Sequence, residues 1–210
     1  MITVHLLRHG ETEWHAESRY AGVSDVALTE RGRQQGRDLA GWAGTAGIGA
    51  VATSDLSRAI QTGEPLAAAA DAPLMIEPGL REVDFGRGEG LTRHEMRKLF
   101  PAALEAFLAA PATSPLPDAE FGTAAAARGL ATLAAVAGRV DDGQALVVVA
   151  HSTLIRLLLC QLLGLPLDDY RRRFPRVANT SLTTILMPAS TGPAELVGMG
   201  ELLRFNAPIC

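Results

Sequence analysis

The chain has 210 residues with a formal net charge of −4 at pH 7, which suits one well-packed domain over residues 1–210. The acidic balance argues against a nucleic-acid partner or an anionic membrane surface, because both require a basic patch. No apolar run approaches the roughly 18 residues of a membrane span, and Arg8 interrupts the first apolar stretch before signal-peptide length, so we expect a cytoplasmic protein.

Apolar runs of strand length alternate along the chain with segments of helical character. The expected strands cover 2–7, 49–53, 74–77, 145–150 and 181–187, and the expected helices cover 29–45, 55–70, 121–140 and 153–164. The run 145–150 is apolar at every position, which is typical of a central strand covered on both faces. The alternation predicts an α/β fold, a three-layer sandwich with helices on both faces of a mostly parallel central sheet.

Residues 91–120 interrupt this alternation. Thr92 and Glu95 have the spacing of a capping box, Pro101 suits the first position of a second helix, and further prolines follow at 111, 115 and 117. We expect a small helical lid inserted here.

The end of the chain predicts the edge of the sheet. Pro188 and Pro193 flank a turn, and an edge strand is expected near 194–199. This edge is the candidate surface for a homodimer about a two-fold axis.

Polar residues follow three of the expected strands. Arg8-His9-Gly10 follows the first strand, the segment from Ser54 to Arg58 follows the second, and His151-Ser152 follows the fourth. Parallel strands bring their carboxyl ends to one edge of the sheet, where open α/β folds bind ligands. Arginine binds phosphate oxygens bidentately, and the helix starts add backbone amides. The sequence therefore predicts a compact cationic pocket for a phosphoryl group.

Five segments resemble the histidine phosphatase superfamily, also called the phosphoglycerate mutase-like family. They are Leu6-Leu7-Arg8-His9-Gly10-Glu11-Thr12, the helix entry at 25–34, the segment 53–62 around Arg58, Leu80-Arg81-Glu82 with the loop up to Gly90, and Val148-Val149-Ala150-His151-Ser152. The segments occur in the family's order and span residues 6–152.

The resemblance implies a role for each of five residues. His9 is similar to the family's nucleophile, which forms a phosphohistidine intermediate. Arg8 and Arg58 are the expected phosphate-binding cations, and His151 is the expected second histidine on the phosphoryl group. Glu82 is the expected general acid and base, which protonates the leaving oxygen and later activates water.

The same resemblance suggests a set of substrate-binding residues. His15 stands where many relatives have asparagine, and Ser152 where many have glycine. Ala21 replaces a common glutamine, and Asp118-Ala119 replaces the glycines that often precede the acidic residue at 120. The expected substrate contacts are His15, Arg19, Tyr20, Gly22, Ser152 and Glu120.

These residues favour a metal-independent phosphomonoesterase that acts on a small phosphorylated metabolite and needs no cofactor. A zinc site from His5 and His9 is not expected, because residues four apart on a strand and its exit do not share a face. The first alternative is a phosphoglycerate mutase, which is disfavoured because the segment 91–120 is short for a lid that excludes water. The second is a non-catalytic relative that binds phospho-ligands or proteins, although such a chain would be expected to have lost His9, Arg58, His151 or Glu82.

Overall fold

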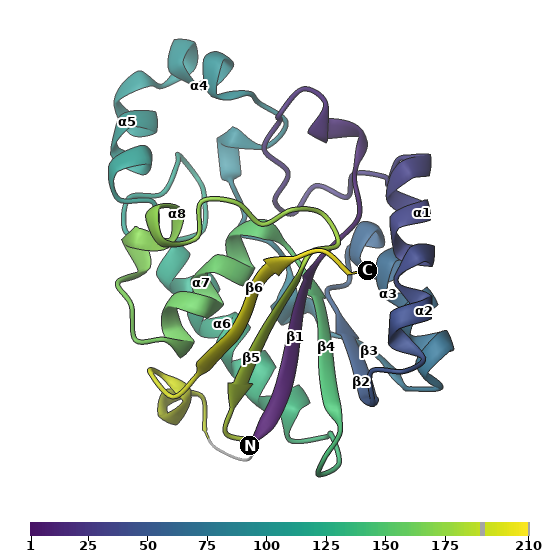
Figure 1. Cartoon of the computed structure of the whole chain (residues 1–210). Coiled ribbons are helices and arrows are strands. Elements are labelled where there is room, and N and C mark those ends of the chain that lie inside the picture. Colours follow the sequence, from purple (N-terminus) through teal and green to yellow (C-terminus); the bar gives the residue numbers. More distant parts are fainter. Residues whose placement is uncertain (190–191, 210) are drawn as a thin grey trace.

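The computed structural model describes residues 1–189 and 192–209, and its centre is a six-stranded sheet in the order β3-β2-β4-β1-β5-β6 (Figure 1). Strands β1 to β4 pair in parallel, whereas β5 is antiparallel to β1 and β6 is antiparallel to β5. The mostly parallel sheet of an α/β fold is therefore confirmed. The strands are β1 (Ile2–Arg8), β2 (Ile48–Thr53), β3 (Leu74–Ile76), β4 (Ala145–Ala150), β5 (Leu182–Met187) and β6 (Glu201–Ala207).

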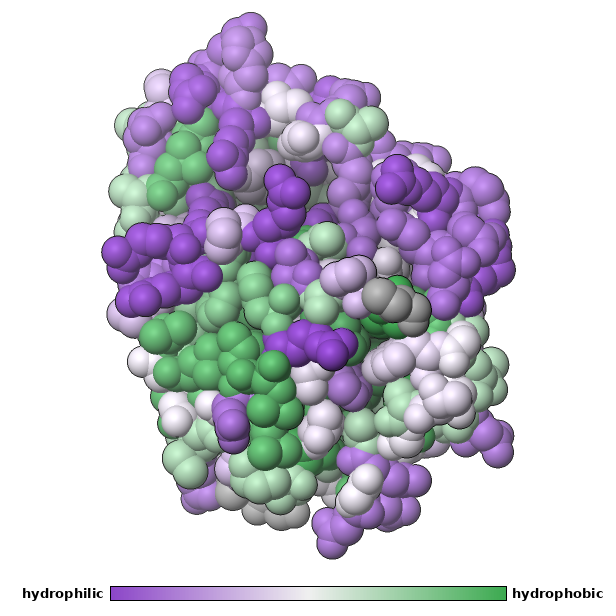
Figure 2. Space-filling model, in the orientation of Figure 1, coloured by the Kyte–Doolittle hydropathy of each residue, from purple (hydrophilic) through white to green (hydrophobic). Residues whose placement is uncertain are grey.

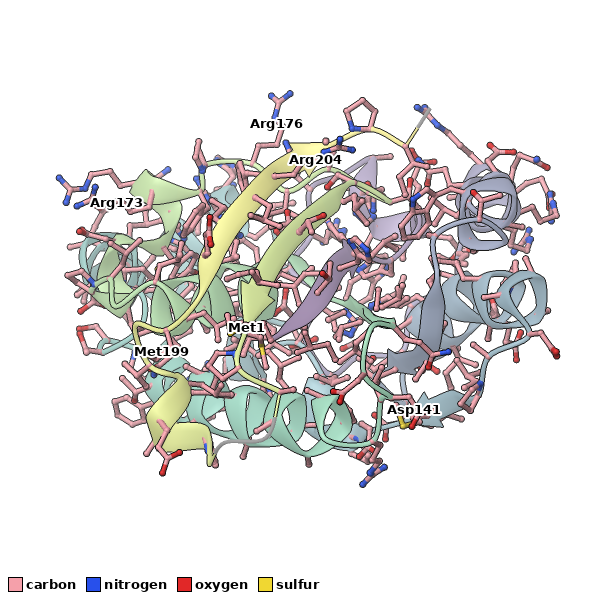
Figure 3. The ribbon with its side chains drawn as sticks, turned by 60° about the horizontal axis from the view of Figure 1, so that its bottom comes forward. Met1, Asp141, Arg173, Arg176, Met199 and Arg204 are labelled. Carbon is pink, nitrogen blue, oxygen red and sulfur yellow. The ribbon has the colours of Figure 1, made fainter. Side chains whose placement is uncertain are left out.

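Helices cover both faces of the sheet, as the uniformly apolar β4 predicts. Leu146 and Val148 belong to the core beneath α6 (Gly122–Ala137) and α7 (Ser152–Leu162), while Val147 and Val149 belong to the opposite core. The second core lies beneath α2 (Ala40–Ala43) and α3 (Ser57–Ala70), and α1 (Glu30–Asp38) packs on α3. Figure 3 shows α6 along one side of the sheet, with Arg204 on the other side. None of the described helices is both long and apolar enough to span a membrane.

The lid expected at 91–120 contains two short helices, α4 (Arg93–Leu99) and α5 (Pro101–Ala109). The Thr92 hydroxyl accepts a hydrogen bond from the Glu95 amide at 3.2 Å, and the Glu95 carboxylate accepts one from the Thr92 amide at 2.7 Å. In Figure 1 these helices lie above the carboxyl ends of the parallel strands, and α8 (Tyr170–Arg173) lies below α5. The lid therefore stands over the edge of the sheet that carries the polar residues.

Two expected elements need correction. The helix expected over 29–45 is divided at Leu39 into α1 and α2. The edge strand expected near 194–199 is a short 3-10 turn, Pro193–Leu196, and the true edge strand is β6. Proline has no N–H for a sheet ladder, and Gly198, at φ +74°, turns the chain before β6 begins. Figure 2 shows an apolar area in the lower left of the view, on the face that carries β6.

Candidate active site

The register of the sheet brings the polar segments together. Arg8 of β1 is aligned with Ala150 of β4, and the His9 amide donates to the Ala150 carbonyl at 3.1 Å. On the other side of β4, Thr53 of β2 is aligned with Val149. His9, Ser54 and His151 therefore leave three adjacent parallel strands at the same level. The His9 and His151 rings have centroids 5.0 Å apart.

His9 is held as a neutral imidazole with one free nitrogen. Its Nδ1 lies 2.7 Å from the Gly10 carbonyl oxygen, which can only accept, so the ring proton is on Nδ1. Burial lowers the pKa of His9 well below the ordinary value of 6.5, and His151, Arg8 and Arg58 lower it further. The Nε2 lone pair is therefore available as a nucleophile at neutral pH.

Arg58 and His151 lie directly behind His9. The Arg58 guanidinium is completely buried and donates to the carbonyls of Ser24 at 2.7 Å and Gly22 at 2.6 Å. Its Nε donates to His151 Nδ1 at 3.3 Å, so the His151 proton is on Nε2, which donates to the Ser54 hydroxyl at 2.7 Å. Neither Arg58 nor His151 borders the open cavity described below.

Arg8 is a second buried cation. It donates to the Val177 carbonyl and to His15 Nε2, both at 2.7 Å, while its buried Nε finds no partner among the described residues. Burial lowers the pKa of Arg8 to about 10, although the nearby Glu82 opposes this shift. No carboxylate forms an ion pair with Arg8 or Arg58 within residues 1–189 and 192–209. An uncompensated buried charge is costly, so an anion bound beside His9 would relieve both arginines.

Glu82 lies in the loop that follows β3 and is 4% exposed. Its two carboxylate oxygens accept hydrogen bonds from the amides of Thr153 at 2.8 Å and Leu154 at 2.9 Å, which are orphan donors of the first turn of α7. The Val83 amide donates a third bond at 3.0 Å. The helix that follows His151 therefore fixes the carboxylate in place.

A cavity of about 870 Å³ lies beneath the lid. Arg8, His9 and Glu82 lie on its wall, together with residues from the loop after β1, the lid, α7 and α8. The remaining lining residues are Thr12, Trp14, His15, Ser18, Arg19, Tyr20, Ala21, Phe85, Thr92, Arg93, His94, Ser152, Thr153, Arg156, Arg171 and Pro175. The cavity is larger than one phosphate needs and leaves room for the rest of a small substrate.

Comparison with known proteins agrees with this geometry. The family model described as "Histidine phosphatase superfamily (branch 1)" matches residues 4–198. The chain belongs to this superfamily. Membership of the superfamily does not determine one activity, because its members include proteins named as mutases and proteins named as phosphatases.

Individual members of the superfamily match nearly the whole chain. A protein of Enterobacter sp. (strain 638), named probable phosphoglycerate mutase GpmB, is 34% identical and the match covers 99% of this chain and 97% of that protein. The structure of a mycobacterial glucosyl-3-phosphoglycerate phosphatase has 27% identity and a TM-score of 0.86, covering 99% of each chain. YhfR of Bacillus stearothermophilus has 28% identity and a TM-score of 0.87, covering 100% of this chain and 98% of its own.

The substrate-binding residues expected from the sequence separate into two groups. His15, Arg19, Tyr20 and Ser152 line the cavity. Gly22 does not: its carbonyl holds Arg58, and its amide donates to the Glu89 carboxylate at 3.0 Å.

Glu120 also lies outside the cavity lining. Its carboxylate pairs with Arg128, with Nε to Oε1 at 2.8 Å, and accepts from the Asp84 amide at 3.4 Å. Because these bonds occupy both oxygens, Glu120 braces the loop that carries Glu82 and is not placed to contact a ligand in the cavity.

His15 bridges two parts of the cavity wall. Arg8 Nη2 can only donate, so His15 Nε2 accepts from it at 2.7 Å and the ring proton is on Nδ1, which donates to the Thr12 hydroxyl at 2.7 Å. Burial, together with the positive charge of Arg8, lowers the pKa of His15 to about 4. A neutral His15 therefore fixes the position of the Arg8 guanidinium.

Sequence reasoning missed several residues of the cavity. The sequence patterns did not single out Arg156, His94 or Arg171, yet all three line the cavity. Asn179 was also missed, and its amide donates to the His9 carbonyl at 2.9 Å. The only available signal for Arg156 was its place one helical turn after Ser152 in a segment already expected to approach the phosphate.

His5, the other histidine of β1, lies apart from the site. Its Nδ1 is 3.0 Å from the Thr184 hydroxyl, and its ring packs edge-on against Trp42. Across the described ranges, no group of three or more His, Cys, Asp or Glu side chains is arranged to hold a metal ion.

Proposed function

We propose that this chain hydrolyses phosphomonoesters of small metabolites through a phosphohistidine on His9. One observation supports the proposal most strongly: His9 is neutral with its proton on Nδ1, and it lies near two buried arginines that form no ion pair with a carboxylate within residues 1–189 and 192–209. Phosphoryl transfer needs mainly positioning and stabilisation of negative charge, and this arrangement supplies both. In support, the mycobacterial phosphatase with the same fold has structures with VO3 and with inorganic phosphate.

The reaction has two steps, which use the same groups in opposite directions. In the first, His9 Nε2 bonds to phosphorus while the ester P–O bond breaks, and Glu82 gives its proton to the departing oxygen. In the second, water attacks the phosphohistidine, Glu82 takes a proton from that water, and the P–N bond breaks to restore neutral His9. The equatorial oxygens stay beside Arg8, with the charge of Arg58 directly behind.

A phosphoglycerate mutase is the second candidate, because the 34% identical relatives carry that name over nearly the full chain. A mutase must return the phosphoryl group to a second hydroxyl before water reaches the phosphohistidine. The two short lid helices and the exposed side chains of Arg93 and His94 at the cavity wall favour access of water. Hydrolysis is therefore the function that the geometry supports best.

The test is phosphate release from p-nitrophenyl phosphate and a panel of sugar and glycerate phosphates, with EDTA present throughout. We expect wild type to release phosphate and His9→Ala to lose turnover by at least about 10³-fold, because the nucleophile is gone. His5→Gln is the matched control, since His5 is on the same strand but does not line the cavity. Quenched reactions with labelled substrate should trap an acid-labile phosphoenzyme in wild type only.

The same assay separates the two candidates. Conversion of 3-phosphoglycerate to its 2-isomer, primed by 2,3-bisphosphoglycerate and faster than phosphate release, would replace the hydrolase by the mutase. Turnover that persists in His9→Ala would contradict both.

A further inference from the structure

The cavity wall carries more positive charge than one phosphoryl group requires. Its lining residues include Arg8, Arg19, Arg93, Arg156 and Arg171, whereas Glu82 is the one acidic side chain among the described lining residues. Arg19 is neutralised by Glu17 and Glu95. Arg8 belongs to the phosphoryl centre, so three arginines remain without a role. This concentration of positive charge contrasts with the net charge of −4 of the whole chain.

Two of the three, Arg156 of α7 and Arg171 of α8, meet at one aromatic ring. Their guanidinium carbons lie over the Tyr170 ring at 4.9 Å and 5.3 Å from its centroid, and Arg171 also lies 4.4 Å from the Phe107 centroid. Neither arginine forms an ion pair within residues 1–189 and 192–209. Burial lowers the pKa of Arg156, and the positive charge of Arg171 adds to this effect.

The stacking fixes the planes of the guanidinium groups and leaves N–H donors at their edges. Arg156 uses Nε and Nη2 on the Ser152 carbonyl and hydroxyl, at 2.9 Å and 3.1 Å, and has Nη1 to spare. The buried Nη1 of Arg171 has no hydrogen-bond partner among the described residues. By contrast, Arg173 and Arg176 project from the surface (Figure 3). Two adjacent, pre-oriented cations with unused donors match a planar or tetrahedral anion.

We propose that Arg156 and Arg171 bind a second anionic group, carried by the leaving alcohol of the substrate. The inference rests on the proposed function and narrows its substrate class to phosphomonoesters with a carboxylate or a second phosphate on the alcohol. Arg156 is one turn beyond Ser152, and the neighbouring amides of Thr153 and Leu154 hold Glu82, the proton donor to the leaving oxygen. The pair therefore lies on the side of the cavity through which the alcohol departs. Arg93, on the lid, donates to the Tyr20 hydroxyl at 3.0 Å and faces the same cavity.

The experiment compares substrates that differ only in the second anion. The first pair is 3-phosphoglycerate against glycerol 3-phosphate, in which a CH2OH group replaces the carboxylate. The second pair is fructose 1,6-bisphosphate against fructose 6-phosphate, which tests phosphate as the second anion. In at least one pair, we expect kcat/KM to be about tenfold higher, or more, for the substrate that carries the second anion. This is the usual contribution of a charge-assisted hydrogen bond.

Arg171→Gln and Arg156→Gln should each reduce that selectivity ratio about tenfold, because each removes one cation from the pair. The selectivity ratio of Arg171→Lys should lie between those of Arg171→Gln and wild type, because lysine keeps the positive charge but lacks the planar pair of guanidinium donors. Arg172→Gln is the matched control: Arg172 is the next residue of α8, but its side chain is exposed and pairs with Asp169. The ratio should be unchanged in this variant.

A ratio near one in wild type for both pairs would overturn the inference while leaving the phosphatase intact. An unchanged ratio in both Gln variants would overturn it as well. Melting temperatures show whether Arg171→Gln has lost its fold, and Arg156→Gln tests the pair independently in that case. Absence of phosphate release from every ester, including p-nitrophenyl phosphate, would instead overturn the proposed function and this inference with it.

Discussion

At the scale of single residues, hydrogen bonds within the protein determine the protonation of the two histidines of the site. The Gly10 carbonyl fixes the His9 proton on Nδ1, and Arg58 fixes the His151 proton on Nε2. The hydrogen bonds of the protein itself therefore determine the tautomer of both histidines, and no ligand is needed for this. Fixed tautomers of this kind would need little reorganisation during the proposed phosphoryl transfer.

Substitution of Glu82 should affect catalytic activity and stability in two ways that can be measured separately. The Glu82→Gln variant cannot protonate the leaving oxygen, so alkyl phosphates should be slowed by about 10²-fold or more and p-nitrophenyl phosphate by much less, because nitrophenolate leaves readily. Parallel kcat/KM measurements on the two substrate types check this. Equal losses on both would remove Glu82 from the role of acid.

The same substitution should also weaken the fold. Both carboxylate oxygens accept backbone amides of α7, whereas a glutamine side chain would turn its NH2 group towards one of these donors. An unsatisfied buried donor costs about 1–3 kcal/mol, so the melting temperature should fall.

At the scale of elements, the loop after β1 and the start of α1 are in backbone contact. A Cβ atom on Gly10 would overlap the Gly32 carbonyl oxygen, and a Cβ atom on Gly32 would overlap the Glu11 carbonyl oxygen. Each glycine is therefore required by close approach of two backbones, one of which carries His9.

Gly32→Ala should accordingly reverse the usual effect of this substitution. In an open helix, Gly to Ala stabilises by about 1 kcal/mol, but here the new methyl group must displace the loop beside His9. We expect Gly32→Ala to lose both melting temperature and turnover. Gly41→Ala in α2 is the control, because its Cβ would meet no atom within 4 Å, and it should be neutral or stabilising. A Gly32→Ala protein as stable as wild type would contradict the close approach.

The strands and the residues that follow them could be predicted from the sequence, because an apolar run of strand length fixes where a strand ends. That reasoning placed His9, Ser54 and His151 on one edge. It could not show that Arg58 and His151 lie behind the cavity wall, since this depends on the register of β1, β2 and β4. The position of the Arg171 side chain could not be predicted for another reason. Helix α8 is only one turn long, and packing on the Tyr170 and Phe107 rings directs this side chain.

At the scale of the whole molecule, the buried histidines make stability depend on pH. Burial is the first cause that lowers the pKa of His5 and of His15 to about 4, and it lowers those of His9 and His151 well below 6.5. Above pH about 6.5 these histidines are neutral in both states, so their proton binding does not favour unfolding. As pH falls below 6.5, these histidines become protonated in the unfolded chain but stay neutral in the folded chain. The free energy of unfolding therefore decreases.

Denaturant unfolding between pH 7.5 and pH 5 checks this prediction. The free energy of unfolding should fall with decreasing pH across that range. The slope should be smaller in His5→Gln, which removes one buried histidine outside the cavity. Stability that stays constant from pH 7 to pH 5 would contradict the lowered pKa values.

The position of β1 in the sheet also sets the order in which this protein can be made. Strand β1 lies between β4 and β5, and both of these strands follow it at a long distance in the chain. At about 5–20 residues per second, a ribosome needs many seconds to supply these partners. The segment that carries His9 therefore stays without its two neighbouring strands until β4 and β5 have been made, and loop closure of this length is slow. The position of His9, the proposed nucleophile, is thus completed by strands that are made well after it.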